Sequence, residues 1–250
     1  MNANIWLLVV GAAVAGFVQG VSGFAFGMVS MSFWVWGIEP RVAAVMTVFG
    51  ALSGQVLSAF TVRRGLSAAT LLPFLVGGAV GIPIGVWALP RFDPAVFKLT
   101  VGAFLLVGCP AMLLASRMPR VTAGGRLADG LVGAVGGVMG GLGGFTGVAP
   151  SLWCTLRGYD KDLQRSVIQN FNLAALSVTM TAYVVSGAVT AEMLPRFAVV
   201  LPALIVPSML GARVYVGLSP LAFRRVVLSV LTAAGVAMVA ASLPTILTRT

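Results

Sequence analysis

Six apolar segments, each long enough to cross a lipid bilayer, constrain the fold of this chain more than any other feature. They cover residues 42–62, 66–89, 95–116, 163–186, 193–216 and 220–243. An α-helix needs about 20 predominantly apolar residues to span the hydrocarbon core. Hydrophobic residues make up 59% of the 250 residues and charged residues only 9%, too few to cover a soluble surface. The sequence therefore predicts an all-α polytopic membrane protein.

The composition excludes several classes of function. The chain has no histidine, which removes Ser-His catalysis, most zinc sites and histidine proton relays. Its two cysteines, Cys109 and Cys154, lie in apolar segments 45 positions apart, so we expect neither a disulfide nor a metal pair. The net charge of +10 comes from basic residues between apolar segments, with no basic patch that alternates with aromatics. Nucleic acid is therefore not an expected partner, and we expect no metal and no cofactor.

Glycine is concentrated in one run, where it makes up eight of the fifteen residues from Gly133 to Gly147. Four glycines near the N-terminus have counterparts 120 positions later, which pair Gly16 with Gly136, Gly20 with Gly140, Gly23 with Gly143 and Gly27 with Gly147. Because glycine disfavours a continuous helix, each run predicts a broken helix pair. The first pair would consist of residues 4–20 and 24–37, and the second would lie within 130–156, either as short crossings or as a re-entrant hairpin. The predicted organisation is a first repeat in 1–116, a connecting loop in 117–129 and a second repeat in 130–250.

The basic residues indicate how the repeats are oriented. If each broken pair enters and leaves on one side, or crosses twice, three spans remain per repeat, the repeats are inverted, and the basic residues divide 11 against 5. If each pair crosses once, the repeats are parallel and the division is nine against seven. Cytoplasmic loops are enriched in Lys and Arg, so the inverted arrangement is favoured, with both termini outside the cytoplasm. The richer face holds Arg63, Arg64, Arg117, Arg120, Arg126, Arg157, Lys161, Arg165, Arg213, Arg224 and Arg225.

Inverted repeats with discontinuous helices are typical of secondary transporters, whose substrate sites lie where the breaks meet. A broken helix leaves backbone N–H groups without partners at the positive end of a helix dipole, so two breaks can bind an anion without a charged side chain. The residues predicted to contact a small oxyanion are Ser22, Gly23, Phe24, Gln55, Gly143, Gly144, Phe145, Thr146, Gln169, Asn170 and Asn172. A structural interpretation exists for each type: glycines permit close packing, hydroxyls cap half-helices, amides bond between helices and phenylalanines pack.

The two glycine-rich motifs, GVSGFAFGMVS from Gly20 to Ser30 and GLGGFTGVAP from Gly141 to Pro150, resemble the paired motifs of the sulfite exporter TauE/SafE family. The resemblance covers nearly the whole chain. It implies a bacterial membrane transporter of sulfur-containing anions such as sulfite and sulfonates, including sulfoacetate. The first motif departs from a glycine triplet, because Phe24, Ala25 and Phe26 follow Gly23.

From the residues and the resemblance together we expect a transporter in the bacterial cytoplasmic membrane, with a small anion and the lipid bilayer as partners. All six acidic residues lie at or near segment ends, so carboxylate-based proton or sodium coupling has weak support and export driven by the membrane potential is favoured. The alternative is an anion channel that shares the same site. An intramembrane enzyme is disfavoured for lack of a base, and a scaffold because it needs no anion site. The oligomeric state stays open, a homodimer included.

Overall fold

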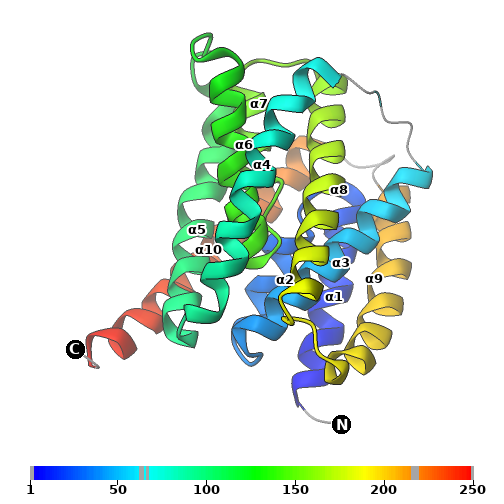
Figure 1. Cartoon of the computed structure of the whole chain (residues 1–250), viewed down its shortest axis with the longest axis vertical. Helices are drawn as coiled ribbons and strands as arrows, with labels where there is room; N and C mark the ends of the chain where they lie inside the picture. The colour runs from blue at the N-terminus through cyan, green and yellow to red at the C-terminus, as the bar shows by residue number, and fades with distance from the viewer. Residues whose placement is uncertain (1–2, 62–64, 66–67, 215–219, 249–250) are drawn as a thin grey trace.

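The computed structural model describes residues 3–61, 65, 68–214 and 220–248, and every regular element within these ranges is a helix (Figure 1). The longer helices are α1 (Ala3–Ser22), α2 (Phe26–Trp34), α3 (Pro40–Thr61), α4 (Ala68–Ala88), α5 (Pro94–Leu114), α6 (Gly125–Gly143), α7 (Val148–Leu156), α8 (Lys161–Val185), α9 (Leu194–Val214) and α10 (Pro220–Leu247). Three short 3-10 helices are η1 (Leu89–Arg91), η2 (Ala115–Arg117) and η3 (Ala191–Met193). Arg63, Arg64 and Arg249, which enter the predicted charge distribution, lie outside the described residues.

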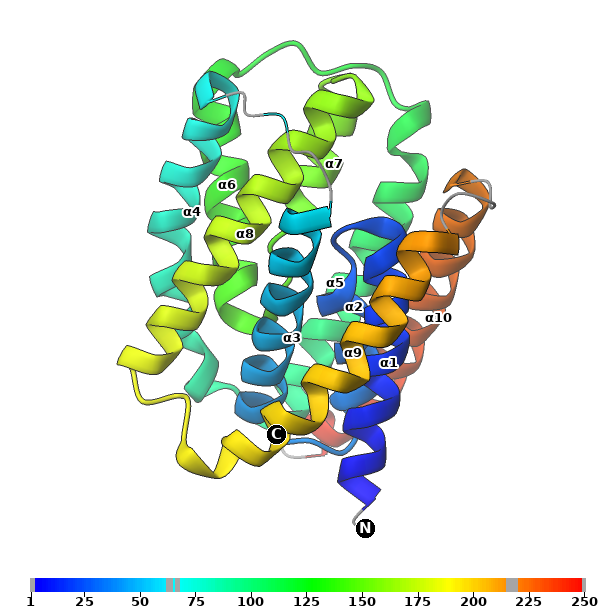
Figure 2. The same cartoon turned by 90° about the vertical axis from the view of Figure 1, so that its right-hand side faces the viewer.

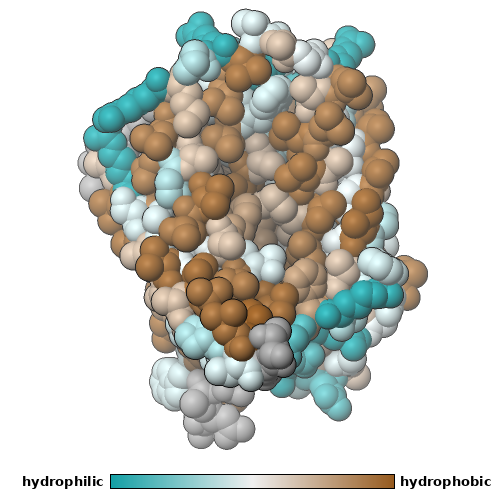
Figure 3. Space-filling model, turned by 90° about the vertical axis from the view of Figure 1, so that its left-hand side faces the viewer, coloured by the Kyte–Doolittle hydropathy of each residue, from teal (hydrophilic) through white to brown (hydrophobic). Residues whose placement is uncertain are grey.

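Six of the described helices, α1, α3, α4, α5, α9 and α10, are long and apolar enough to cross a membrane. Five of them correspond to predicted spans. The sixth, α1, is 20 residues long, because the helix continues through Gly20 and ends at Ser22 instead of breaking earlier. The predicted span 163–186 forms the 25-residue α8, which is long enough to cross but carries several amides and hydroxyls and is not among the six. On the face in Figure 3, a broad band of hydrophobic side chains lies between hydrophilic margins, as expected for a membrane protein.

Each broken pair is a hairpin that returns to the end where it began (Figure 2). At the end of α2, the indole Nε1 of Trp34 donates a hydrogen bond to the Leu7 carbonyl near the start of α1, at 3.0 Å. At the end of α7, the indole Nε1 of Trp153 donates to Asp129 Oδ1 in α6, at 2.7 Å. The sequence left short crossings and re-entrant hairpins as alternatives; both return to the same end, so these contacts fit either, and α1 is long and apolar enough to cross.

The two halves of the chain exchange packing partners. Helix α1 of the first half packs on α9, while α6 of the second half packs on α4, and α5 pairs with α10 and α3 with α8. Glycines allow the close approach: a Cβ atom placed on Gly16 would lie 2.6 Å from the Leu204 carbonyl oxygen, and one on Gly133 would lie 2.2 Å from that of Phe74. Inverted repeats would produce such reciprocal contacts; the inversion and the division into 1–116, 117–129 and 130–250 stay predictions.

Candidate functional site

Both helix breaks are turned by a glycine in the left-handed conformation. Gly23 has φ 83° directly after α1, and Gly144 has φ 75° directly after α6. A side chain is strained in this region, whereas glycine adopts it without cost, so these positions set where the helices end. The turn closes on the preceding helix, since Gly23 N–H donates to the Gln19 carbonyl at 2.7 Å and Gly144 N–H to that of Gly140 at 2.8 Å. The first break is therefore at residues 23–25, slightly beyond the predicted Gly20 to Gly23.

The two breaks meet in the interior of the molecule. A Cβ atom placed on Gly27, in the first turn of α2, would lie 2.6 Å from the carbonyl oxygen of Gly144. Such a distance is shorter than any real carbon contact, so only a glycine lets α2 cross the second break here. The 120-residue repeat of the glycine pattern thus brings two distant segments into backbone contact.

Two side-chain amides, one from each half, reach the first break. Gln55 on α3 donates from Nε2 to the Gly23 carbonyl at 2.7 Å. Gln169 on α8 places its Nε2 atom 3.3 Å from where a Cβ of Gly23 would lie. The Ser22 hydroxyl oxygen accepts hydrogen bonds from the backbone N–H groups of Phe24, at 3.4 Å, and Ala25, at 3.2 Å. Of the predicted residues, Ser22, Gly23, Gln55 and Gln169 are therefore together.

The second break carries a buried hydroxyl–amide pair. Thr146 Oγ1 donates to Asn172 Oδ1 at 2.8 Å, and the two residues are 2% and 1% exposed. A Cβ atom on Gly147 would lie 2.7 Å from Asn172 Nδ2, so the amide covers the backbone of the break. Thr146 and Asn172, predicted from the sequence as separate donors, are direct partners.

Thr47 on α3 is a residue of the site that the predicted set did not include. Its Cγ2 atom lies 3.0 Å from the Cβ position of Gly144, and its hydroxyl is 3.2 Å from that of Ser30. Thr47 contacts the second break as Gln169 contacts the first. The two residues are 122 positions apart, close to the 120-position spacing of the paired glycines. The signal that could have found it is a polar residue in an apolar span at the repeat distance from Gln169.

Three of the predicted site residues, Asn170, Phe145 and Phe24, contact other parts of the protein. Asn170 points away from the breaks: its Nδ2 donates to the Gly65 carbonyl at 3.1 Å and to the Ser166 carbonyl at 2.9 Å. Phe145 packs its ring against Phe104, with centroids 5.1 Å apart, and Phe24 packs against the hydrophobic core. For both phenylalanines the packing interpretation fits the contacts.

Two backbone carbonyls at the breaks accept side-chain hydrogen bonds, whereas the helices that follow start without side-chain caps. The Gly23 carbonyl accepts from Gln55, and the Gly141 carbonyl accepts from the buried Tyr183 hydroxyl at 2.7 Å. Neither Ala25, which precedes α2, nor Gly147, which precedes α7, makes a side-chain capping bond. One carbonyl just beyond α1 and one near the end of α6 are thus paired with side-chain donors, and the uncapped starts of α2 and α7 add positive potential at the breaks.

The central contacts are closed in this conformation. Gln55, Thr146, Gln169 and Asn172 are each at most 5% exposed. Two cavities of about 630 and 230 Å³ lie elsewhere, one between α4 and α6 and one between α6 and α7. A ligand could therefore reach these four side chains only after the surrounding helices move.

A family model described as "Sulfite exporter TauE/SafE" matches residues 8–238. No curated protein and no solved structure shows significant similarity to the chain. Members of this family are membrane transporters of sulfite or related anions and are not enzymes. With six helices in its described part apolar enough to span a membrane and a family match over nearly its whole length, the chain belongs to the sulfite exporter TauE/SafE family of multi-pass membrane transporters.

Proposed function

We propose that this protein exports a small sulfur-containing anion across the bacterial cytoplasmic membrane. The anion would be either sulfite or an organic sulfonate such as sulfoacetate. The anion would bind between the two helix breaks and be released by alternating access. The observation that carries this proposal is the crossing of the breaks at Gly27 and Gly144, beside the uncapped starts of α2 and α7. Such an arrangement attracts an anion with dipoles alone, which suits a chain with no histidine and few acidic residues.

Neutral side chains would complete the site. The hydroxyl of Thr146 and the amides of Gln169 and Asn172 can donate hydrogen bonds to sulfonate oxygens once the breaks separate. Hydrogen bonds to a charged acceptor are about twice as strong as neutral ones, so exchanging an internal Thr146–Asn172 bond for bonds to an oxyanion is favourable. Gln55, which holds the Gly23 carbonyl, would keep the negative end of α1 away from the anion.

Contacts between the halves at opposite ends of α3 and α8 suit an alternating-access movement. At one end, Ser166 and Asn170 of α8 donate to the Gly65 carbonyl just beyond α3. At the other end, Arg41 at the start of α3 donates to the carbonyls of Gly187 and Ala188, just beyond α8. Opening either end would break one set while keeping the other. Asn170, which lies away from the breaks, would then act as part of a latch and not as a ligand.

Export needs no coupling ion in this proposal. An inside-negative potential favours the exit of an anion by about 2.3 kcal/mol per charge per 100 mV. Among the described residues near the breaks, the side chains are neutral, so no carboxylate is available to carry a proton with the substrate. If transport into vesicles required a proton gradient with the electrical potential clamped to zero, this part of the proposal would be wrong.

The test is equilibrium binding of sulfite, sulfoacetate, taurine, sulfate and acetate to the purified protein, with Thr146→Val and Gln169→Leu beside the wild type. We expect selective binding of one sulfur-containing anion that both substitutions weaken. Equal weak binding of all five anions, unaffected by either substitution, would contradict the proposed site. Discrete single-channel currents in planar bilayers would instead support the anion-channel alternative.

A further inference from the structure

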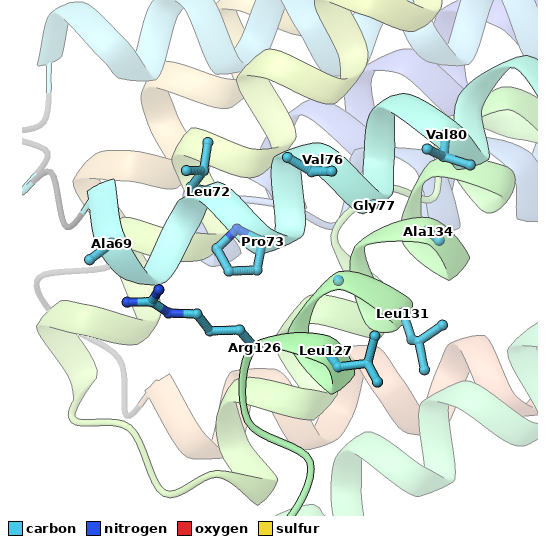
Figure 4. A pocket seen from close by; sticks show the side chains of 11 residues that line it. Ala69, Leu72, Pro73, Val76, Gly77, Val80, Arg126, Leu127, Leu131 and Ala134 are labelled. Carbon is cyan, nitrogen blue, oxygen red and sulfur yellow. The ribbon is translucent and has the colours of Figure 1, made fainter.

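A groove on the outer surface of the molecule lies apart from the helix breaks. It has a volume of about 630 Å³ and runs between α4 and α6 (Figure 4). Its walls are exposed aliphatic side chains, Leu72, Val76 and Val80 from α4 and Leu127 and Leu131 from α6. Because α4 is long and apolar enough to span the membrane and its exposed aliphatic side chains would face lipid, we infer that this groove opens toward the bilayer.

The groove exists because the floor between its walls has almost no side chains. A Cβ atom on Gly77 would lie 1.8 Å from the Gly130 carbonyl oxygen, and one on Gly81 would lie 2.1 Å from that of Ala134. The two helices are therefore in backbone contact along parallel paths, while the larger residues on either side stand apart. The resulting trough is narrow, elongated and apolar, the shape of an acyl chain.

One end of the groove is positively charged. Arg126 is a lining residue near the start of α6, and Figure 4 shows its side chain extending along that end toward Ala69, near the start of α4. The parallel helices place both of their N-terminal ends here, and Gly124 makes no side-chain capping bond at the start of α6. The positive-inside rule assigns Arg126 to the cytoplasmic face, where anionic lipids give the membrane a negative surface potential.

We propose that this groove is a binding site for one anionic phospholipid of the cytoplasmic leaflet. An acyl chain lies along the trough between Val76 and Leu131, and the phosphate of the headgroup pairs with Arg126. A second copy of this chain is a poorer occupant because the protein carries 6 acidic residues against 16 basic ones. Asp129, the acidic residue nearest to Arg126 in the sequence, is buried and bonded to Trp153.

The experiment is native mass spectrometry of the full-length protein, reconstituted in bilayers of phosphatidylglycerol, phosphatidylcholine or an equal mixture of the two. We compare Arg126→Gln and Arg126→Lys, which test the charge, and Val76→Trp, which fills the trough. Matched controls are Arg117→Gln, an exposed arginine outside the groove, and Val107→Trp, an exposed valine of α5.

We expect one phosphatidylglycerol to remain bound to the wild type, to Arg126→Lys and to both controls, in preference to phosphatidylcholine. Arg126→Gln should weaken the preference about five-fold, the contribution of one basic side chain near an anionic surface. Val76→Trp should remove the bound lipid. Equal retention of both lipids by the wild type, or unchanged binding in Arg126→Gln, would overturn the proposal. So would a change of oligomeric state in Val76→Trp with lipid binding intact, since the occupant would then be a second copy.

Discussion

The two helix breaks share a glycine pattern but differ in their surroundings. At the first break Ser22, Gly23 and Phe24 are partly exposed, whereas Gly143 to Val148 at the second break are buried. Just after the first break, the ring of Phe26 packs directly against Gly50. A Cβ atom placed on Gly50 would lie 2.3 Å from that ring. The position 120 residues after Phe26 is Thr146, which bonds to Asn172.

A repeated backbone geometry therefore does not imply repeated chemistry. The glycines give both breaks the same turn, while an aromatic–glycine contact in one half is replaced by a hydroxyl–amide contact in the other. We therefore expect the second break to supply most of the specificity for the anion, and the first to supply the more accessible side of the site.

The largest effect is expected where the two breaks touch. Gly27→Ala would force a methyl group against the Gly144 carbonyl, and overpacking of this kind costs about 1–3 kcal/mol. We expect loss of transport in proteoliposomes and a lower free energy of unfolding in detergent. The control is Gly108→Ala, whose Cβ would meet Val148 at an ordinary 3.6 Å. A Gly27→Ala protein as stable and as active as the wild type would contradict the close contact between the two breaks.

The next largest effect is expected for a substitution at Asn172, beside the second break, and not for one at Phe26, just after the first. Asn172→Leu removes the partner of the Thr146 hydroxyl and an amide donor, and a hydrogen bond to a charged group contributes about 1.5–3 kcal/mol. The dissociation constant of the anion should therefore rise at least about ten-fold. Phe26→Leu should lower stability by about 1 kcal/mol through lost packing and leave the dissociation constant unchanged. Titration calorimetry and thermal unfolding measure the two effects, and equal changes in affinity would remove the distinction between the breaks.

A smaller difference, in the free energy of unfolding, is expected between alanine substitutions of the two glycines with positive φ. Gly144→Ala and Gly23→Ala both place a side chain at positive φ, which costs about 1–3 kcal/mol. The new Cβ at residue 144 would also meet Thr47 at 3.0 Å, whereas at residue 23 it would meet only the flexible end of Gln169 at 3.3 Å. Gly144→Ala should therefore be less stable by a further ~1 kcal/mol. Gly187→Ala, with φ 69° and no atom within 4 Å of its Cβ position, reports the backbone strain alone.

The least perturbing test compares accessibility. Ser22→Cys should react with a water-soluble maleimide faster than Thr146→Cys, because Ser22 is partly exposed and Thr146 is 2% exposed. The native thiols of Cys109 and Cys154 are 0% exposed and should give little background labelling. Mass spectrometry of the intact protein follows the reaction. Equal rates for the two variants would mean that the second break is as open as the first.

The location of the helices and of both breaks could be predicted from the sequence because these features depend on local properties. Hydropathy over about 20 residues identified five of the six helices that are apolar enough to span. Glycine marked the breaks, since Gly23 and Gly144 occupy backbone conformations that other residues avoid. The extent of α1 was missed because a glycine inside a helix, such as Gly20, lowers helix propensity without ending the helix.

Membrane insertion, the approximate positions of the helix breaks and the family could thus be read from the amino-acid sequence. Which polar side chains meet at the breaks depends on how the helices pack. Gln169 and Asn170 are adjacent in the sequence, yet one reaches Gly23 and the other the Gly65 carbonyl, because successive residues of a helix point about 100° apart. Thr47 and Gly144 come together across 97 positions of the chain. Such contacts depend on the rotation and depth of helices packed by distant glycines, and no local pattern encodes them.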